Sequence, residues 1–462
     1  MREKIKSMAN EIPKKQKLNY GLYFFGQNVS YIIVSGYLST YALDIGIAAY
    51  ALSVILLVIK VWDAMNDTLF GFALEKIHLK GGKYYPWIRL SVFLIPITTI
   101  LVFAIPSSLS LWLKITWLVV SYSIWDLAYT IGDVPLYAMS TTMTDVPQER
   151  TNIISIGRAL GMLGSLLASI ILPIVEESMG SWFIPVSVVM VIFTFTMVPI
   201  CSTKKFHYEN YTVKREKDPT FKQMLKYVFG NKYMLIFYIA MFVWYSGNLT
   251  NSLSLIFARE CLGNGTLSSV LSVAMLIPWM IMPLIVPAIS KRIDKTVFFM
   301  ICFVLQLVIG VVQYFVGYES LGLMLAIMVV RNIPLGFVMC FIFTFIGDIC
   351  EYGTYKNGID AKGIGFAAHT FFTKLMTAFQ TVLATFCLGL IGYVEGDNAI
   401  QIATLPHDLW IVYALVPVIA SAIALPIFLL YKLRDKDIAL MAKCNNGSMP
   451  REECEAQLSR KY

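Results

Sequence analysis

Residues 47–74 read IAAYALSVILLVIKVWDAMNDTLFGFAL and carry Lys60, Asp63 and Asp67 within an otherwise apolar run. This run exceeds the roughly 20 mostly apolar residues that a helix needs to cross a bilayer. Each charge near the bilayer centre costs at least about 2.5–3.5 kcal/mol on insertion scales, so the charges that persist there usually face a partner or a polar interior. The stretch therefore predicts a membrane-spanning helix with functional charges.

The whole chain has the composition of a polytopic membrane protein. Of its 462 residues, 57% are hydrophobic and 14% are charged, against roughly 25% charged residues in soluble domains. This balance excludes a soluble enzyme, a disordered chain and a disulfide-stapled secreted domain. The eight cysteines form no CxxC pair and the four histidines lack metal-ligand spacing, so we expect neither a resident metal nor a cofactor.

Twelve apolar stretches long enough to span a membrane follow one another along the chain. They lie at about residues 18–42, 47–74, 88–106, 112–140, 152–175, 181–201, 233–257, 266–288, 297–316, 322–349, 364–393 and 408–431. The polar residues 202–232 divide them six and six, as two bundles around a central cavity require. We therefore predict an all-α membrane protein with six-helix bundles at residues 18–201 and 233–431.

The basic residues predict the orientation of these spans. With the N-terminus inside, 31 Lys and Arg residues fall on one side of the membrane and two on the other. Because basic residues collect on the cytoplasmic side, we expect the N-tail (residues 1–17), the middle loop (202–232) and the C-tail (432–462) to be cytoplasmic. The localisation expected is the plasma (inner) membrane, with many passes.

Two carboxylates of the second span share one helix face. Asp63 and Asp67 are four residues apart, and Asn66 lies on the same turn. Carboxylate and amide oxygens suit a hard cation such as Na⁺, Li⁺ or H⁺. Two unneutralised carboxylates so close repel each other, which leaves room for one cation between them. The alternative is a structural ion pair between Lys60 and Asp63.

The fourth span carries a second polar stripe. Asp126, Thr130 and Asp133 follow one another at helical spacing, and Tyr137 comes one turn after Asp133. A carboxylate beside an aromatic ring can hold a sugar, since the carboxylate accepts from two hydroxyls while the ring packs against C–H groups. The alternative for this stripe is a capping role or an ion pair with Arg158 or Lys374.

Three further charges lie in the tenth span or at its end. Asp348 and Glu351 fall at the inner end near Lys356, where we predict a cytoplasmic salt-bridge lock. Arg331 is expected to pair with a carbonyl group or an acid across helices, and it is a further candidate for this gating role.

These motifs together resemble one transporter family. KVWDAMNDTLFG (Lys60–Gly71), the later GGKYYPW that ends at Trp87, TIGDVPLY (Thr130–Tyr137), and GDICEYGTYKNG ahead of GIGFAAHTFFTKL are similar to the signature of the glycoside–pentoside–hexuronide:cation symporters. That family, which includes melibiose permease, belongs to the major facilitator superfamily. The resemblance covers essentially the whole chain, in order.

The resemblance implies a residue set for each ligand. It implies the major facilitator fold, a cation site made of Asp63, Asn66, Asp67 and Thr130, and a sugar site that includes Asp133, Tyr137, Arg158 and Lys374.

Three positions of the sugar site differ from the melibiose branch, and one of them, Tyr137, matches a tryptophan there and stays aromatic here. The first-span acid that contacts sugar there falls at Asn28, and Asp126 matches a position without an acid. We hypothesise that Asp126 supplies the missing acid function, so Asn28 and Asp126 complete the expected substrate set.

The expected function is cation-coupled symport of a sugar or glycoside by alternating access, by a protein that acts as a monomer. Neutral oxygens at Asn66 and Thr130 favour Na⁺ as the coupling ion, with H⁺ or Li⁺ as alternatives. Two other functions stay open: symport of a lipid-like or other amphipathic solute, and a non-transporting membrane sensor of the same fold. An enzyme is not expected, because the sequence shows no nucleophile–base set.

Overall fold

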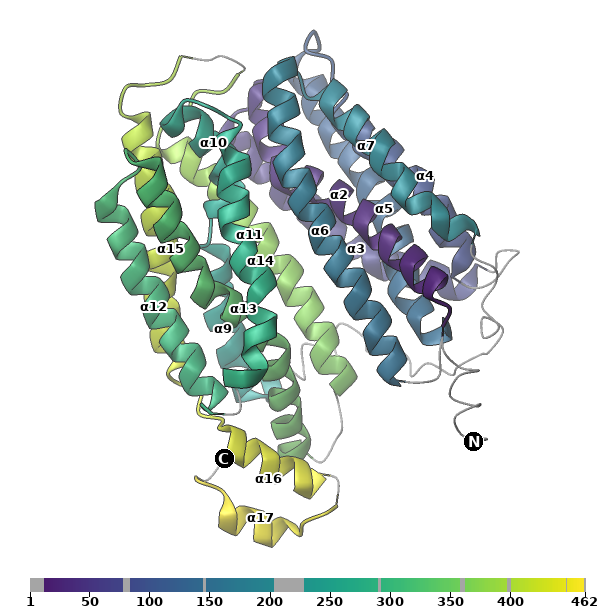
Figure 1. The fold of residues 1–462 in the computed structure, drawn as a ribbon, viewed down its shortest axis with the longest axis vertical. Coiled ribbons are helices and arrows are strands. Elements are labelled where there is room, and N and C mark those ends of the chain that lie inside the picture. Colours follow the sequence, from purple (N-terminus) through teal and green to yellow (C-terminus); the bar gives the residue numbers. More distant parts are fainter. Residues whose placement is uncertain are drawn as a thin grey trace. The chain divides into compact units, whose positions relative to one another are not determined.

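The computed structural model describes residues 12–77, 84–143, 147–202, 228–289, 292–357, 362–396, 400–445 and 447–460. Helices build this part of the chain (Figure 1). They are α2 (Lys14–Asp44), α3 (Ala49–Lys76), α4 (Tyr85–Val102), α5 (Leu111–Met143), α6 (Pro147–Met179), α7 (Phe183–Met197), the short 3₁₀ helix η1 (Val198–Ser202), α9 (Lys232–Ser246), α10 (Thr250–Leu262), α11 (Leu267–Ile289), α12 (Lys295–Val316), α13 (Leu321–Asn357), α14 (Lys362–Leu390), α15 (Leu405–Phe428), α16 (Asp435–Asn445) and α17 (Arg451–Gln457).

The helical class predicted from the sequence is confirmed. In the described residues there is no strand, and eight helical segments are long and apolar enough to cross a membrane. Among these segments are α12, α13 and α15, whose mean hydropathies over the membrane window are 2.3, 2.1 and 2.4. The described part of the protein is therefore all-helical, and its long apolar helices are those of a multi-pass membrane protein.

The seventh predicted span, residues 233–257, is not one continuous helix. It is interrupted between Ser246, where α9 ends, and Thr250, where α10 begins. The side-chain amide of Gln380 donates a hydrogen bond to the Asn248 carbonyl oxygen in the break. A helix can break at membrane depth only where other groups satisfy the freed backbone, and Gln380 does so here.

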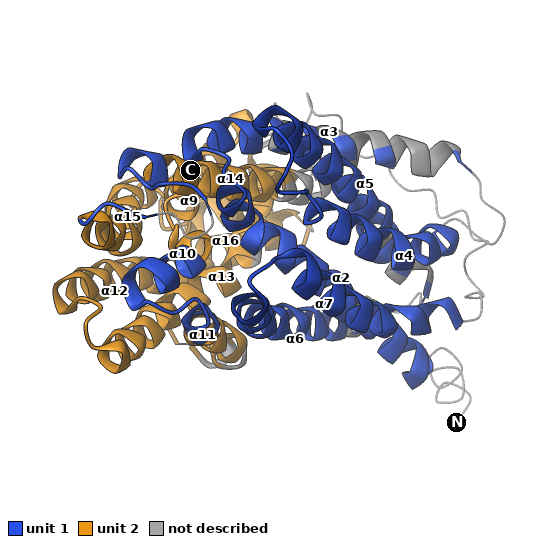
Figure 2. Cartoon of the chain, turned by 90° about the horizontal axis from the view of Figure 1, so that it is seen from above, with its two compact units in different colours: residues 1–214, 254–272, 388–403 blue, residues 215–253, 273–387, 404–462 orange. Residues whose placement is uncertain are grey.

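The chain divides into two compact units, shown in blue and orange in Figure 2. Unit 1 comprises residues 1–214, 254–272 and 388–403, and unit 2 comprises residues 215–253, 273–387 and 404–462. Unit 1 thus includes two segments from the second half of the sequence. The division into bundles at the middle loop, residues 202–232, stays a prediction.

Glycines let α2 and α6 approach closely in unit 1. A Cβ atom at Gly164 would collide with the Phe25 carbonyl oxygen, and one at Gly157 would lie 2.7 Å from the ring of Phe24. Small residues spaced along one helix face are a common way for membrane helices to pack, because lipid supplies no hydrophobic drive between helices. This contact determines where the side chains of α2 lie.

A buried ion-pair cluster, here called the Arg259 cluster, ties residues 254–272 to the rest of unit 1. Arg259 on α10 donates to Asp44 Oδ2 at 2.9 Å and to Glu176 Oε1 at 2.7 Å. Trp182 Nε1 also donates to Asp44, at 2.8 Å. The charged side chains are 7–20% exposed, and both carboxylates have a charged donor, as buried charges require.

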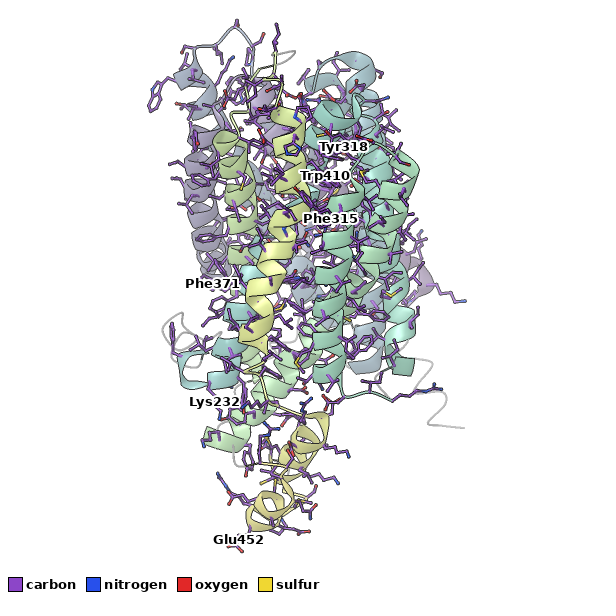
Figure 3. All side chains as sticks on the ribbon, turned by 90° about the vertical axis from the view of Figure 1, so that its left-hand side faces the viewer. Lys232, Phe315, Tyr318, Phe371, Trp410 and Glu452 are labelled. Atoms are coloured by element: carbon purple, nitrogen blue, oxygen red, sulfur yellow. The ribbon has the colours of Figure 1, made fainter. Side chains whose placement is uncertain are left out.

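Unit 2 packs around aromatic rings. Phe299 on α12 lies between Phe345 on α13 and Phe428 on α15, with centroid distances of 4.8 and 4.6 Å. At the other end of α12 and α15, Figure 3 labels Tyr318 and Trp410, whose ring centroids are 5.4 Å apart.

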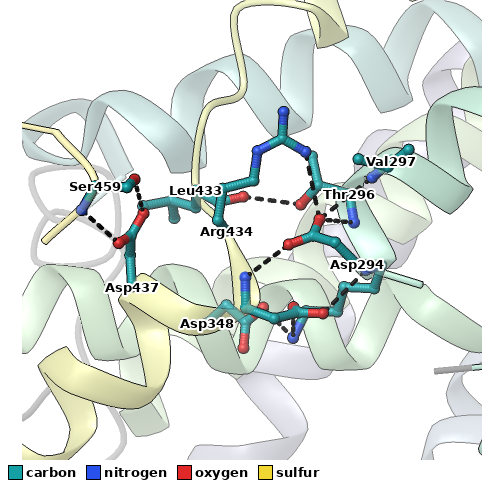
Figure 4. A network of polar contacts seen from close by, with 10 residues as sticks. Asp294, Thr296, Val297, Asp348, Leu433, Arg434, Asp437 and Ser459 are labelled. Atoms are coloured by element: carbon teal, nitrogen blue, oxygen red, sulfur yellow. Dashed lines mark hydrogen bonds and ion pairs between the residues drawn. The ribbon is translucent and has the colours of Figure 1, made fainter. Parts of the chain in front are cut away.

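Polar contacts bind the C-tail to the rest of unit 2 (Figure 4). Asp294 caps the start of α12 and also accepts from the Asp435 backbone N–H at 3.0 Å. Asp437 accepts from the Ser459 hydroxyl at 2.5 Å, which holds the end of the chain against α16. Burial raises the pKa of the Cys454 thiol in α17. The tail is therefore part of the folded protein.

Candidate functional site

The motif KVWDAMNDTLFG on α3 packs against the start of α4, where the motif GGKYYPW ends. Phe70 on α3 meets Trp87 on α4 edge to face, with ring centroids 5.3 Å apart. Both side chains are buried, and Pro86 occupies the first turn of α4, where its missing N–H costs nothing. This contact orients the acidic half of α3 relative to α4.

On α3, the structure describes the side chains of Asp63 and Asn66. Asn66 is buried at 2% exposure, and Asp63 is half-buried. The side chains of Asp67 and Lys60 lie outside the described residues. The predicted sharing of one cation by Asp63 and Asp67, and the alternative pairing of Lys60 with Asp63, therefore stay predictions.

Asn66 meets the polar stripe of α5. Its Nδ2 donates to Asp126 Oδ2 at 2.9 Å and to Thr130 Oγ1 at 3.1 Å. The resemblance placed Asn66 and Thr130 in one cation site, and the structure brings these two residues together. Asp126, expected in the substrate set, contacts Asn66 instead of standing apart from it.

A second polar cluster surrounds Asp133, seven residues further along α5. Gln27 on α2 donates from Nε2 to Asp133 Oδ1 at 2.9 Å. Tyr137 is hydrogen-bonded to Arg158 on α6 and lies within electrostatic range of Asp133. Tyr20 interacts electrostatically with these same three groups. Three of the expected sugar-site residues, Asp133, Tyr137 and Arg158, are thus neighbours.

Glycine explains how α5 brings the TIGDVPLY motif close to α2. A Cβ atom at Gly132 would collide with the Tyr23 hydroxyl and lie 3.0 Å from Ser91 Oγ. Those two hydroxyls are hydrogen-bonded to each other at 2.5 Å. The glycine before Asp133 therefore allows α5 to pack against this buried pair, which places Asp133 opposite α2.

Asn28 is held by its own helix. Its Nδ2 donates to the Phe24 carbonyl oxygen at 2.9 Å, and Gly161 on α6 leaves room for its amide. One amide hydrogen is therefore engaged, and the second hydrogen and Oδ1 can contact a ligand. The half-buried side chain lies one residue after Gln27, on the helix that bounds the Asp133 cluster.

The remaining predicted residues belong to unit 2. Lys374 lies on α14. Asp348 forms an ion pair with Lys295 at 2.5 Å, and Lys295 also pairs with Asp435 at 3.0 Å. These ion pairs connect α12, α13 and α16 within unit 2, so they hold the C-tail. The cytoplasmic salt-bridge lock predicted for Asp348 stays a prediction.

Two other gating candidates have uncharged hydrogen-bond partners. Glu351 accepts from Asn445 Nδ2 on α16 at 2.9 Å. Arg331 donates to Gln313 Oε1 on α12 at 2.7 Å. The sequence predicted a carbonyl group or an acid as the partner of Arg331, and the partner observed is the side-chain carbonyl oxygen of Gln313. The gating role stays a prediction for both Glu351 and Arg331.

Sequence reasoning missed Gln27 and the Arg259 cluster. Gln27 is fully buried in a predicted membrane span, and an amide at membrane depth is itself a signal because it needs hydrogen-bond partners. The contact of Arg259 with Asp44 joins residues 215 positions apart. No local spacing indicates such a pair.

Known proteins similar to this chain are transporters. The family model described as MFS/sugar transport protein matches residues 19–435. An isoprimeverose transporter from Lactiplantibacillus pentosus is 25% identical, with 93% of this chain and 91% of the relative covered. A glucuronide carrier protein homolog from Escherichia coli (strain K12) is 26% identical, with 93% and 94% covered.

Two further similarities concern coupling and fold. A putative glycoside/cation symporter, YagG, from Escherichia coli (strain K12) is 22% identical, with 94% of this chain and 95% of the relative covered. Among solved structures, a point mutant of the nucleoside transporter NupG superposes with a TM-score of 0.63 at 15% identity, covering 89% of this chain and 100% of that chain. This structural likeness concerns the fold alone.

Proposed function

Because the chain belongs to the MFS/sugar transport protein family, whose members are transporters rather than enzymes, we propose that it is a cation-coupled symporter of a sugar or glycoside. It acts as a monomer by alternating access. It crosses the plasma (inner) membrane twelve times, with both termini cytoplasmic. The count of twelve is supported by the eight long apolar segments described above together with four further long helices. These four, α2, α3, α5 and α11, each have 23 residues or more.

The observation that carries this proposal is the placement of two polar clusters on one helix. Thr130, which contacts Asn66, and Asp133, which contacts Gln27, are three residues apart on α5. A cation bound by Asp63, Asn66, Asp67 and Thr130 changes the charge near Asp133, which we propose binds the sugar together with Asn28, Tyr137 and Arg158 of unit 1 and Lys374 of unit 2. Each ligand then raises the affinity for the other, as thermodynamic linkage demands.

Sodium is the proposed coupling ion. Amide and hydroxyl oxygens are useful ligands for a hard metal ion, whereas a proton needs only a carboxylate. One charge moving through about 100 mV supplies about 2.3 kcal/mol, and a tenfold gradient adds about 1.4 kcal/mol. Together, about 3.7 kcal/mol supports roughly 500-fold accumulation of the sugar with one cation.

Uptake into proteoliposomes tests the proposal. A panel of radiolabelled sugars that includes isoprimeverose and a glucuronide is offered with an inward gradient of NaCl, LiCl or choline chloride, and separately with a pH gradient. We expect accumulation of at least one sugar to require Na⁺. Uptake that is driven equally by choline chloride would reject sodium coupling, and transport of none of the sugars would reject the substrate class.

Matched variants locate the cation site within this assay. Asp63→Asn should abolish sodium-driven accumulation, because it removes a carboxylate from the proposed site, while sugar exchange at equal concentrations persists. Asp408→Asn, at the start of α15 in unit 2, makes the same chemical change elsewhere and should transport normally. Equal gradient-driven uptake by both variants would disprove the role of Asp63.

A further inference from the structure

The side-chain amide of Asn66 is held from one side by two acceptors. Asp126 and Thr130 are four residues apart on α5, so their side chains lie on one helix face. Both accept from Asn66 Nδ2, at 2.9 Å from Asp126 Oδ2 and 3.1 Å from Thr130 Oγ1. An amide nitrogen carries two hydrogens, so each acceptor can take one.

The chemistry of Asp126 determines which way this amide faces. An ionised carboxylate only accepts hydrogen bonds, so it attracts the NH₂ group and repels the amide oxygen. The amide nitrogen therefore faces Asp126. Asn66 Oδ1 must then point away from Asp126, and Thr130 Oγ1, which accepts one hydrogen bond from the amide, keeps a second lone pair for the cation.

Burial makes this orientation persistent. Asn66, Thr130 and Asp126 are 2%, 3% and 5% exposed. In a dry environment a hydrogen bond to a charged acceptor is strong, and an unsatisfied donor is costly. The amide therefore has little freedom to turn its oxygen toward Asp126.

We propose that Asp126 is a positioning residue of the cation site, which aims Asn66 Oδ1 at the coupling metal ion. The inference rests on the proposed function and adds a residue to it. A hard cation takes neutral carbonyl oxygens as ligands, and partners that orient a ligand from behind tune metal affinity. This role is an alternative to the hypothesis that Asp126 supplies an acid to the sugar, and it rests on the contact of Asp126 Oδ2 with Asn66.

Sodium binding to the purified full-length protein tests this role without any sugar. NaCl is titrated calorimetrically, with choline chloride keeping ionic strength constant. Asp126→Ala should weaken sodium binding about 10–100-fold, the usual loss when an orienting partner of a metal ligand is removed. Asp126→Asn should lose less, because its amide oxygen still accepts from Asn66.

A double-mutant cycle distinguishes a positioning role of Asp126 from direct binding of the ion by its carboxylate. If Asp126 acts through Asn66, Asp126→Ala should weaken sodium binding no further in an Asn66→Ala background. If Asp126 instead binds the ion itself, the two losses add on a logarithmic scale, which overturns the proposal. Where Asp126→Ala does not yield folded protein, Asp126→Ser gives the same comparison, since its shorter side chain does not reach Asn66.

The outcomes also separate this inference from the proposed function. Absence of sodium binding and of sodium-driven uptake in the wild-type protein refutes the function itself, and with it the inference. Normal sodium coupling in the wild type, with unchanged sodium affinity in Asp126→Ala, refutes the inference alone. Reduced affinity for the sugar found by the uptake panel, with sodium affinity unchanged, also overturns it and restores the sugar role.

Discussion

Replacing Arg259 by alanine should destabilise unit 1 more than any other single charge change considered above. The guanidinium bonds Asp44 at 2.9 Å and Glu176 at 2.7 Å. Its loss leaves two buried carboxylates facing each other, at 8% and 7% exposure, with no cation between them. The contact with Trp182 is lost as well.

The magnitude follows from the burial of the cluster. Removing one member of a buried ion pair costs about 3–5 kcal/mol, mainly through the charge left behind. Because Arg259 is itself 20% exposed, water screens part of the effect and the lower value applies. A loss of about 3 kcal/mol in a unit of this size lowers Tm by roughly 6–12 °C.

Thermal unfolding of the purified protein in detergent measures this difference. Glu177→Gln is the matched control, since it removes one charge beside Glu176 without touching the bonds of Arg259. Adding Glu176→Gln to Arg259→Ala should recover part of the lost stability, because one of the stranded charges disappears. The reasoning is refuted if Arg259→Ala melts within about 2 °C of the control.

The remaining predictions concern packing and the C-tail. Gly164→Ala should lower the free energy of unfolding by about 1–3 kcal/mol, because it forces α2 and α6 apart. The control Gly36→Ala on α2, whose new Cβ meets Ile32 only at 3.9 Å, should leave Tm unchanged or raise it slightly. Equal Tm values for the two variants would contradict the close contact. Lys295→Met should expose the C-tail to protease, because Asp348 and Asp435 then lose their shared cation. Adding Asp348→Asn should restore protection, and a cleavage rate unchanged by Lys295→Met would show that this ion pair does not bind the tail.

Local patterns predicted the class and much of the candidate site. Apolar length indicated membrane helices. The i, i+4 spacing put Asp126 and Thr130 on one face of α5, and the structure confirms that face through Asn66. The family resemblance placed Asp133, Tyr137 and Arg158 in one site, and these residues are neighbours. Such features depend on helical periodicity, which the chain carries locally.

Other features depend on how helices are rotated against one another. Nothing in the spacing of α5 indicated that Asp126 faces Asn66 while Asp133 faces Gln27. The break between α9 and α10 was missed for the same reason. The Asn248 carbonyl oxygen in this break accepts a hydrogen bond from Gln380, which is distant in the sequence.

The sequence by itself determined that this protein is a helical membrane transporter of the sugar family, since apolar length, sparse charge and motif order are properties of the chain alone. Only the tertiary structure decided which partner each buried polar group has. A charge at membrane depth requires a partner, but the sequence does not say which one. Helix packing brought Asp126 to Asn66, and the proposed positioning role of Asp126 rests on that contact.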